Sequence, residues 1–74
     1  MSVTKTFLLE GLCCANCAAA IEREVATVSG VESAIVNLDD TTITVVFIAD
    51  ELLMFQTVAS IASEIDEDII TKII

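Results

Sequence analysis

The order in which two hydrophobic periodicities follow one another is the strongest constraint on the fold of this 74-residue chain. Residues 4–10 are rich in β-branched and aromatic side chains and end at Gly11, which predicts a strand with Phe7 and Leu9 on one face. Residues 16–28 instead carry a run of alanines and apolar side chains at helical spacing, namely Cys17, Ile21, Val25 and Val28. We therefore expect a helix there, ended by Ser29 and Gly30.

The second half of the chain predicts a hairpin, a helix and a last strand. Residues 31–38 and 42–48 alternate, and the turn residues 39–41 between them favour a hairpin. Asp50 is a suitable cap for a helix that runs to about Glu64, and residues 69–74 form the last strand. The side chains expected to face the core are Ala34, Val36, Leu38, Ile43, Val45, Phe47, Phe55, Val58, Ala59, Ala62 and Ile65, with Leu12 anchoring the first loop.

The resulting order is βαββαβ in a single domain, residues 1–74, without linkers or repeats. Layer-packing rules resolve this order as an α+β, ferredoxin-like fold, in which a four-stranded antiparallel sheet carries two helices on one face. Leu8, Ile35, Val46 and Ile73 are expected on the opposite face. They are either scattered surface residues or a docking patch for another domain.

Charge and composition exclude several classes of partner. Twelve acidic and 3 basic residues give a formal charge of −9, which argues against nucleic acid. No run approaches the roughly 20 apolar residues that span a bilayer, so membrane insertion by this chain is not expected. The first residues lack the pattern of a secretory signal, which predicts a cytoplasmic location, where clustered cysteines bind metal or do redox chemistry. The acidic residues within 64–68 are either a solvated loop or a means of stabilising a cation or attracting a basic partner.

All three cysteines lie in one short segment, at the junction of the first strand and the first helix. Cys14 and Cys17 are one helical turn apart, so both sulfurs can face one point, and Cys13 beside them offers a third donor. A helix N-terminus also lowers thiol pKa values and keeps sulfur ligands ionised. Three soft ligands in such a short segment predict a metal site formed by Cys13, Cys14 and Cys17.

Residues 11–17, Gly-Leu-Cys-Cys-Ala-Asn-Cys, resemble the Gly-Met-x-Cys-x-x-Cys motif of heavy-metal-associated domains. These domains occur as small metallochaperones and as N-terminal domains of metal-exporting P-type ATPases. Leu12 stands in place of methionine, while Cys14 and Cys17 match the two metal-binding cysteines of the motif. The resemblance implies that this domain binds metal and passes it on without catalysis of its own. Its expected partners are other domains of a metal-transporting ATPase or a metallochaperone.

Cys13 occupies the variable position of the motif and bears on metal preference. Copper(I) members of the family need only two thiolates, whereas zinc, cadmium and lead exporters often add an aspartate ligand at this position. A third thiolate raises the coordination number, which predicts Zn2+, Cd2+ or Pb2+ as the bound ion. The acidic residues 64–68 stand where copper members often carry Gly-Tyr or a lysine, which favours a divalent ion in the same way.

Three alternatives remain open at this stage. If Cys13 is a spectator, the chain binds Cu+, as a free-standing copper metallochaperone does. A thiol-disulfide redox protein also places a Cys-x-x-Cys at a strand-to-helix junction, but the absence of proline and tryptophan and the short length disfavour it. A structural zinc site needs four protein ligands, and the chain has three cysteines and no histidine.

Overall fold

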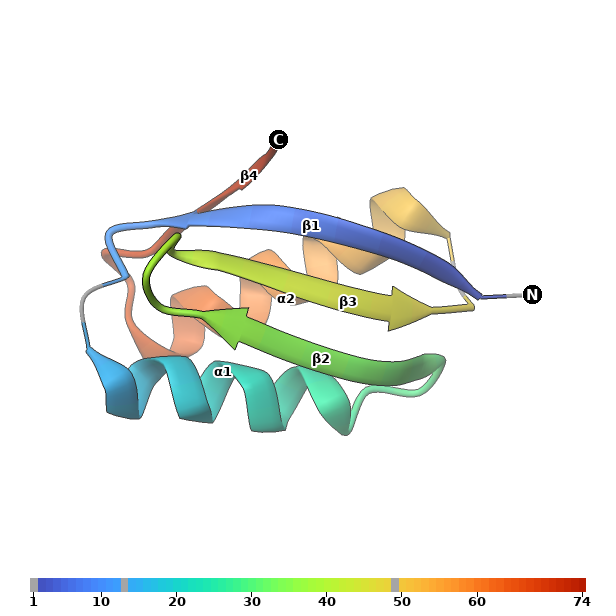
Figure 1. The fold of residues 1–74 in the computed structure, drawn as a ribbon, viewed down its shortest axis with the longest axis horizontal. Helices are drawn as coiled ribbons and strands as arrows, with labels where there is room; N and C mark the ends of the chain where they lie inside the picture. Colours follow the sequence, from blue (N-terminus) through green and yellow to red (C-terminus); the bar gives the residue numbers. More distant parts are fainter. Residues whose placement is uncertain (1, 13, 49) are drawn as a thin grey trace.

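The computed structural model describes residues 2–12, 14–48 and 50–74 and shows the predicted order of elements (Figure 1). Two helices alternate with four strands: β1 (Val3–Glu10), α1 (Ala15–Ala26), β2 (Val31–Asn37), β3 (Thr42–Phe47), α2 (Glu51–Ile65) and β4 (Ile70–Ile73). Each element lies within two residues of its predicted bounds at either end. Neither helix in the described part of the chain is long and apolar enough to cross a membrane.

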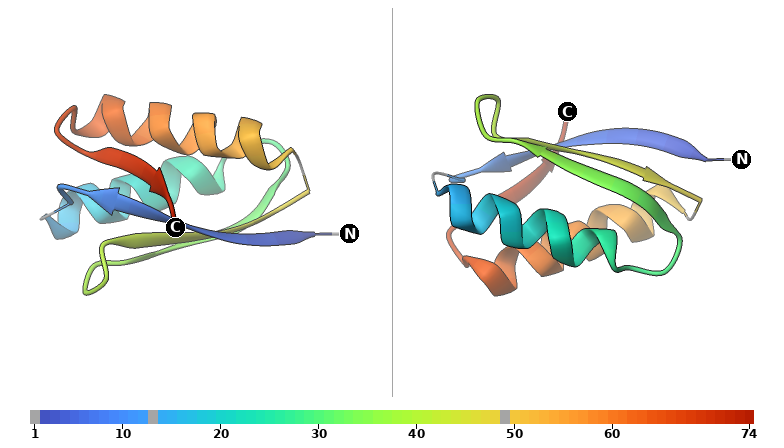
Figure 2. Two further views of the ribbon diagram at one scale, coloured as in Figure 1. Left: turned by 90° about the horizontal axis from the view of Figure 1, so that it is seen from above. Right: turned by 60° about the horizontal axis from the view of Figure 1, so that its bottom comes forward.

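The four strands form one antiparallel sheet in the order β2-β3-β1-β4. Both helices pack on the same face of the sheet, as the two views of Figure 2 show. The predicted ferredoxin-like fold is therefore confirmed. Because β1 and β4 are antiparallel neighbours, with Glu10 opposite Ile70, the loop after β1 and the loop before β4 meet at one end of the sheet.

The core lies between the sheet and the two helices and contains most of the side chains predicted for it. Cys17, Ala34, Val36, Phe55 and Ile65 are half-buried and pack against it. Its buried members are Phe7, Leu9, Leu12, Ala18, Ile21, Val25, Ile43, Val45, Phe47, Met54, Val58, Ala62 and Ile69. Phe7 stacks at a tilt on Phe55 of α2, with 5.7 Å between ring centroids. The prediction for Leu38 is wrong, because β2 ends at Asn37 and Leu38 turns outward in the hairpin loop. The burial of Met54 was not predicted, yet this side chain in the first turn of α2 lies in the core.

The face opposite the helices carries threonines and a few apolar side chains. Strand register places Leu8 opposite Thr42 and Ile35 opposite Thr44 on this face, as predicted. Ile73 does not lie there: it pairs with Phe7, whose side chain enters the core, and directly paired residues share a face. The prediction for Ile73 is wrong because the register of β4 directs Thr71, opposite Leu9, and Ile73 toward the helices.

Candidate metal site

The loop between β1 and α1 is held from both sides before the cysteines begin. Leu12 is buried in the core, and its backbone N–H donates to the Leu9 carbonyl at 3.2 Å. Gly11 has a φ of 95°, in the left-handed region that favours glycine. A Cβ at Gly11 would lie 2.7 Å from the backbone oxygen of Asp68. Glycine is therefore required where this loop passes the loop between α2 and β4.

Cys14 and Cys17 lie at the N-terminus of α1, as the sequence predicted. Cys14 is the N-cap residue with extended backbone, and its carbonyl accepts the first helical hydrogen bond from Ala18 at 3.0 Å. Its side chain is exposed, and it makes no capping hydrogen bond of standard geometry. Cys17, in the first turn, is half-buried and packs against the core. One sulfur is thus open to solvent while the other is fixed by the fold.

The N-terminus of α1 favours the thiolate form of Cys14. The backbone N–H of Cys17, then that of Asn16 and then the Cys17 side chain lower the pKa of Cys14 from the 9.0 of an ordinary thiol. Slight desolvation and the negative charge of Asp66 act in the opposite direction. The helix amides dominate because the first-turn N–H groups have no partners within the helix and point toward the sulfur. A thiolate is the form of cysteine that binds metal.

Asp66 connects the acidic segment 64–68 to the cysteines. It is the C-cap residue of α2, and its Oδ1 accepts the Asp68 N–H at 3.0 Å, which orders the turn. Its negative charge raises the pKa of Cys14 and is the smallest of the contributions to that pKa. The sequence displayed the acidic segment but could not place it. The pairing of β1 with β4 could have predicted this placement, because it brings the loop after β1 and the loop before β4 to the same end of the sheet.

Cys13 lies outside the described residues. Within residues 2–12, 14–48 and 50–74, no three side chains of the histidine, cysteine, aspartate or glutamate types are grouped closely enough to hold a metal ion. The described donors are thus the Cys14 and Cys17 pair at the surface. Such a pair can take up a thiophilic ion and leave the rest of its coordination sphere to an exchanging ligand.

A comparison with protein families tests the family relationship that the cysteine motif indicated. The model of the heavy-metal-associated domain matches residues 6–73, which include all three cysteines, the larger part of β1 and the other five elements in full. The chain belongs to the heavy-metal-associated domain family. Family membership establishes heavy-metal binding as the general function of the domain. No individual curated protein is matched significantly.

Solved structures agree in fold with this domain over nearly its whole length. The N-terminal domain of a potential copper-translocating P-type ATPase from Bacillus subtilis, in the Cu(I)-loaded state, is 28% identical with a TM-score of 0.77, and the match covers 99% of this chain and 88% of that one. The N-terminal domain of PacS from Synechocystis PCC6803 is 28% identical with a TM-score of 0.74, covering 97% of both chains. Oxidized MerP from Ralstonia metallidurans CH34, at 16% identity and a TM-score of 0.76, covers 99% of this chain and 97% of its own and shows the fold alone.

These relatives give no support to the predicted preference for zinc, cadmium or lead. The metal named for the Bacillus domain is Cu(I). The preference rests on Cys13 and on the acidic segment. Cys13 lies outside the described residues, and Asp66 completes no group of three ligands with Cys14 and Cys17.

Proposed function

We propose that this heavy-metal-associated domain captures a thiophilic metal ion through Cys14 and Cys17 and passes it between proteins, as the cytoplasmic N-terminal part of a metal-exporting P-type ATPase. The observation that carries the proposal is the placement of the two cysteines, one exposed and one half-buried, at the amide-rich N-terminus of α1. A thiolate pair on an exposed helix end binds soft ions without closing over them. The ion can therefore be handed on by ligand exchange with cysteines of a partner.

The two described sulfurs are sufficient for Cu(I). This ion accepts low coordination numbers and prefers thiolate ligands, so Cys14 and Cys17 bind it without a third donor. The Cu(I)-loaded Bacillus domain, at 28% identity, supports copper as one cargo of this site. The position of Asp66 near Cys14 adds negative charge to an already anionic dithiolate, which favours cations of higher charge over Cu(I).

Cys13 gives the domain its choice of metal in this proposal. Zn2+, Cd2+ and Pb2+ use larger coordination spheres than Cu(I), and a third thiolate next to the pair supplies one more soft ligand. Cys14 and Cys17 accordingly determine whether metal binds, and Cys13 determines how well the divalent ions compete with Cu(I). The three cysteines together, rather than the pair alone, favour a divalent-metal exporter.

Single substitutions separate these roles. Cys14→Ser and Cys17→Ser should each abolish tight binding of every thiophilic ion. Competition titrations that monitor the ultraviolet thiolate-to-metal absorption measure this loss. Cys13→Ser should leave Cu(I) affinity unchanged and weaken Cd2+ or Pb2+ by a factor of roughly 10 to 100, the scale on which even outer-shell changes alter metal affinity. An equal loss of affinity for Cu(I) and Cd2+, or no loss for either ion, would show that Cys13 does not set the metal preference. Copper would then be the favoured cargo.

A free-standing metallochaperone would have the same site as a transporter domain. The reading frame of the gene distinguishes these two kinds of protein. An open reading frame that continues past residue 74 into membrane-spanning segments supports the transporter, whereas a stop codon there supports the chaperone. The acidity of the chain, with 12 acidic and 3 basic residues, favours the transporter domain as an acceptor for a basic carrier.

A further inference from the structure

Strand β2 is an edge of the sheet, and a side chain of α1 occupies one of its outward amides. In the strand order β2-β3-β1-β4, β2 stands at one end and pairs with β3. The Val36 backbone N–H donates to a carboxylate oxygen of Glu22, at 2.8 Å. Because this N–H donates to the helix and not to β3, it points toward the outer side of the edge. The Glu22 oxygen therefore lies where the carbonyl of a further strand would accept the same N–H.

The outward groups of β2 form a short self-complementary stretch. Directions alternate along a strand, so the N–H and C=O of Ala34 point outward together with those of Val36. Two copies of β2 that pair in antiparallel orientation around Ile35 would place Ala34 of each copy opposite Val36 of the other. These residues would exchange N–H···O=C bonds, and the two Ile35 side chains would lie directly opposite each other. Ile35 is 62% exposed in the single copy, so the twofold contact would also bury apolar surface.

The first part of β2 is irregular, so the regular part is the one that needs protection. The pairing of β2 with β3 shifts in register between Val31 and Ser33, which makes Glu32 an extra residue, as in a β-bulge. A bulge twists an edge and interrupts its row of outward groups, which disfavours pairing with a further strand. Beyond the bulge the pairing with β3 is regular as far as Asn37. The bond from Glu22 falls within this regular part.

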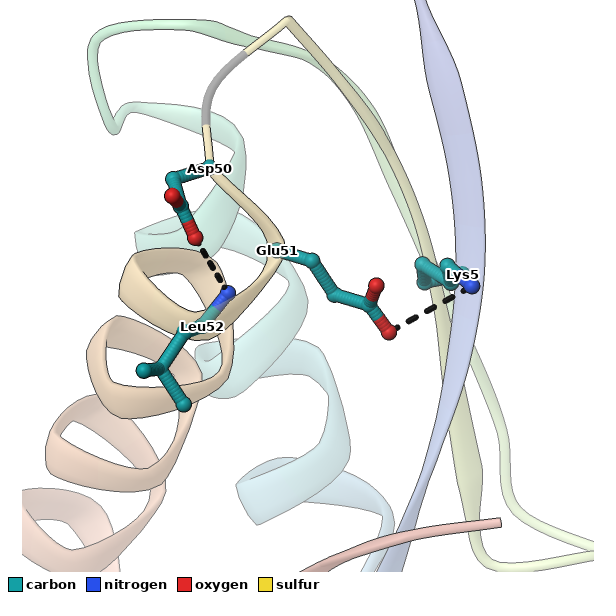
Figure 3. A network of polar contacts seen from close by, with 4 residues as sticks. All are labelled: Lys5, Asp50, Glu51 and Leu52. Carbon is teal, nitrogen blue, oxygen red and sulfur yellow. Dashed lines mark hydrogen bonds and ion pairs between the residues drawn. The ribbon is translucent and has the colours of Figure 1, made fainter.

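The bond from Glu22 differs in kind from the contact that joins the other helix to the sheet. Figure 3 shows the Lys5 ammonium of β1 reaching the Glu51 carboxylate of α2, at 3.3 Å. That ion pair joins two side chains and occupies no backbone group of a strand. Glu22 instead joins its helix to a strand through a backbone N–H, and edge pairing needs that same N–H.

We propose that the edge of β2 is a self-pairing surface and that Glu22 keeps it unpaired, so that the domain stays monomeric. The carboxylate occupies the Val36 N–H in a partly buried hydrogen bond, which a second copy must break before the two strands pair. Breaking it leaves a charged acceptor without its donor, and this cost adds to that of bringing two chains of charge −9 together. This inference is independent of the metal-binding function proposed above.

The test compares two glutamates of α1 whose substitution removes the same charge. Glu22→Ala removes the acceptor of the Val36 N–H, whereas Glu24→Ala removes an exposed carboxylate of the same helix and is the matched control. Sedimentation equilibrium of the reduced apo domain, from micromolar to millimolar concentration, should give the 7.9 kDa monomer for the parent chain and for Glu24→Ala. Glu22→Ala should approach twice that mass as the concentration rises. Glu22→Gln keeps a side-chain oxygen as acceptor and should stay monomeric.

Hydrogen exchange measures the bond itself. In dilute Glu22→Ala, the Val36 amide should exchange about tenfold faster than in the parent chain, because it has lost a charged acceptor. The amide of Val45, which lies on the interior strand β3, should keep its rate and so report that the fold is intact. At high concentration the exchange of the Val36 amide should slow again as β2 pairs with its copy.

A second substitution tests the register centred on Ile35. When Ile35→Lys is added to Glu22→Ala, two like charges lie directly opposite each other in the paired strands. The double variant should therefore return to the monomer, although the added lysine lowers the net negative charge of each copy. A monomeric Glu22→Ala at every concentration, equal association of Glu24→Ala, or a dimer that Ile35→Lys leaves intact would each overturn the proposal.

Discussion

Cys14 combines two tasks that usually fall to different residues. As the N-cap of α1 it begins the helix, and as a thiol it meets the first-turn amides, which favour its ionised form. Serine at this position would cap the helix better than cysteine does, so loss of metal binding in Cys14→Ser cannot be attributed to a weakened helix.

The charge of Asp66 should tune the reactivity of Cys14. Because the pKa of Cys14 lies below 9.0, alkylation of the apo protein should reach half its maximal rate below pH 9.0. Asp66 raises this pKa, so Asp66→Asn should move the alkylation profile to lower pH, while asparagine retains an acceptor for the Asp68 N–H. Rates would be followed by mass spectrometry of the Cys14 peptide. Glu32→Gln, at the start of β2, is the control, and an equal shift in that variant would contradict a local effect.

Gly11 should be the least replaceable residue of the loop. Gly11→Ala imposes a positive φ on alanine and brings its Cβ to 2.7 Å from the Asp68 oxygen, so the free energy of unfolding should fall by about 2 kcal/mol. Urea denaturation of the apo domain measures the loss. Gly30→Ala is the comparison, because Gly30 also has a positive φ, of 93°. Equal losses at both glycines would show that the backbone shifts enough to relieve the close approach of the new Cβ at position 11 to the Asp68 oxygen, leaving only the cost of the positive φ.

At the scale of elements, the sequence was sufficient where one periodicity dominates. The alternation in residues 42–48 and the helical spacing in residues 16–28 predicted which side chains are buried, because each element has one face on the core. The position of Cys14 and Cys17 at a helix start followed in the same way. The prediction for Ile73 was wrong because a strand of four residues carries little periodic signal. The register of that strand is set by its pairing with β1. The effect of the Asp66 charge on the pKa of Cys14 links two loops that are distant in the sequence, and no local pattern encodes it.

Strand β4 contains a polar group that the fold does not satisfy. Thr71 is buried opposite Leu9, and its hydroxyl has no hydrogen-bond partner within the described residues. Valine has the same branched shape without the hydroxyl, so Thr71→Val should raise the free energy of unfolding by about 1 kcal/mol. Thr44→Val is the control, since the Thr44 hydroxyl lies 3.2 Å from that of Thr6 and its removal should give no gain. Stabilisation by both valines would point to β-propensity instead.

At the scale of the whole molecule, the metal site lies outside the structure that holds the domain together. The buried cluster joins the sheet, both helices and Leu12, while Cys14 is exposed and Cys17 only borders the core. We therefore expect the ion to bind to a preformed fold. This differs from small zinc domains, in which binding and folding are one event.

The apo domain should consequently fold without metal. Circular dichroism of the reduced, chelator-treated protein should show the mixed signature of helix and sheet and a cooperative thermal transition. Metal that binds only the native state raises the midpoint by mass action, so added Cd2+ should shift the transition upward in proportion to the logarithm of its concentration, without altering the spectrum below it. Cys14→Ser should keep the apo spectrum and lose the shift, because it removes a ligand and leaves the core intact. A random-coil spectrum of the apo protein would contradict this expectation and make the metal a structural component of the fold.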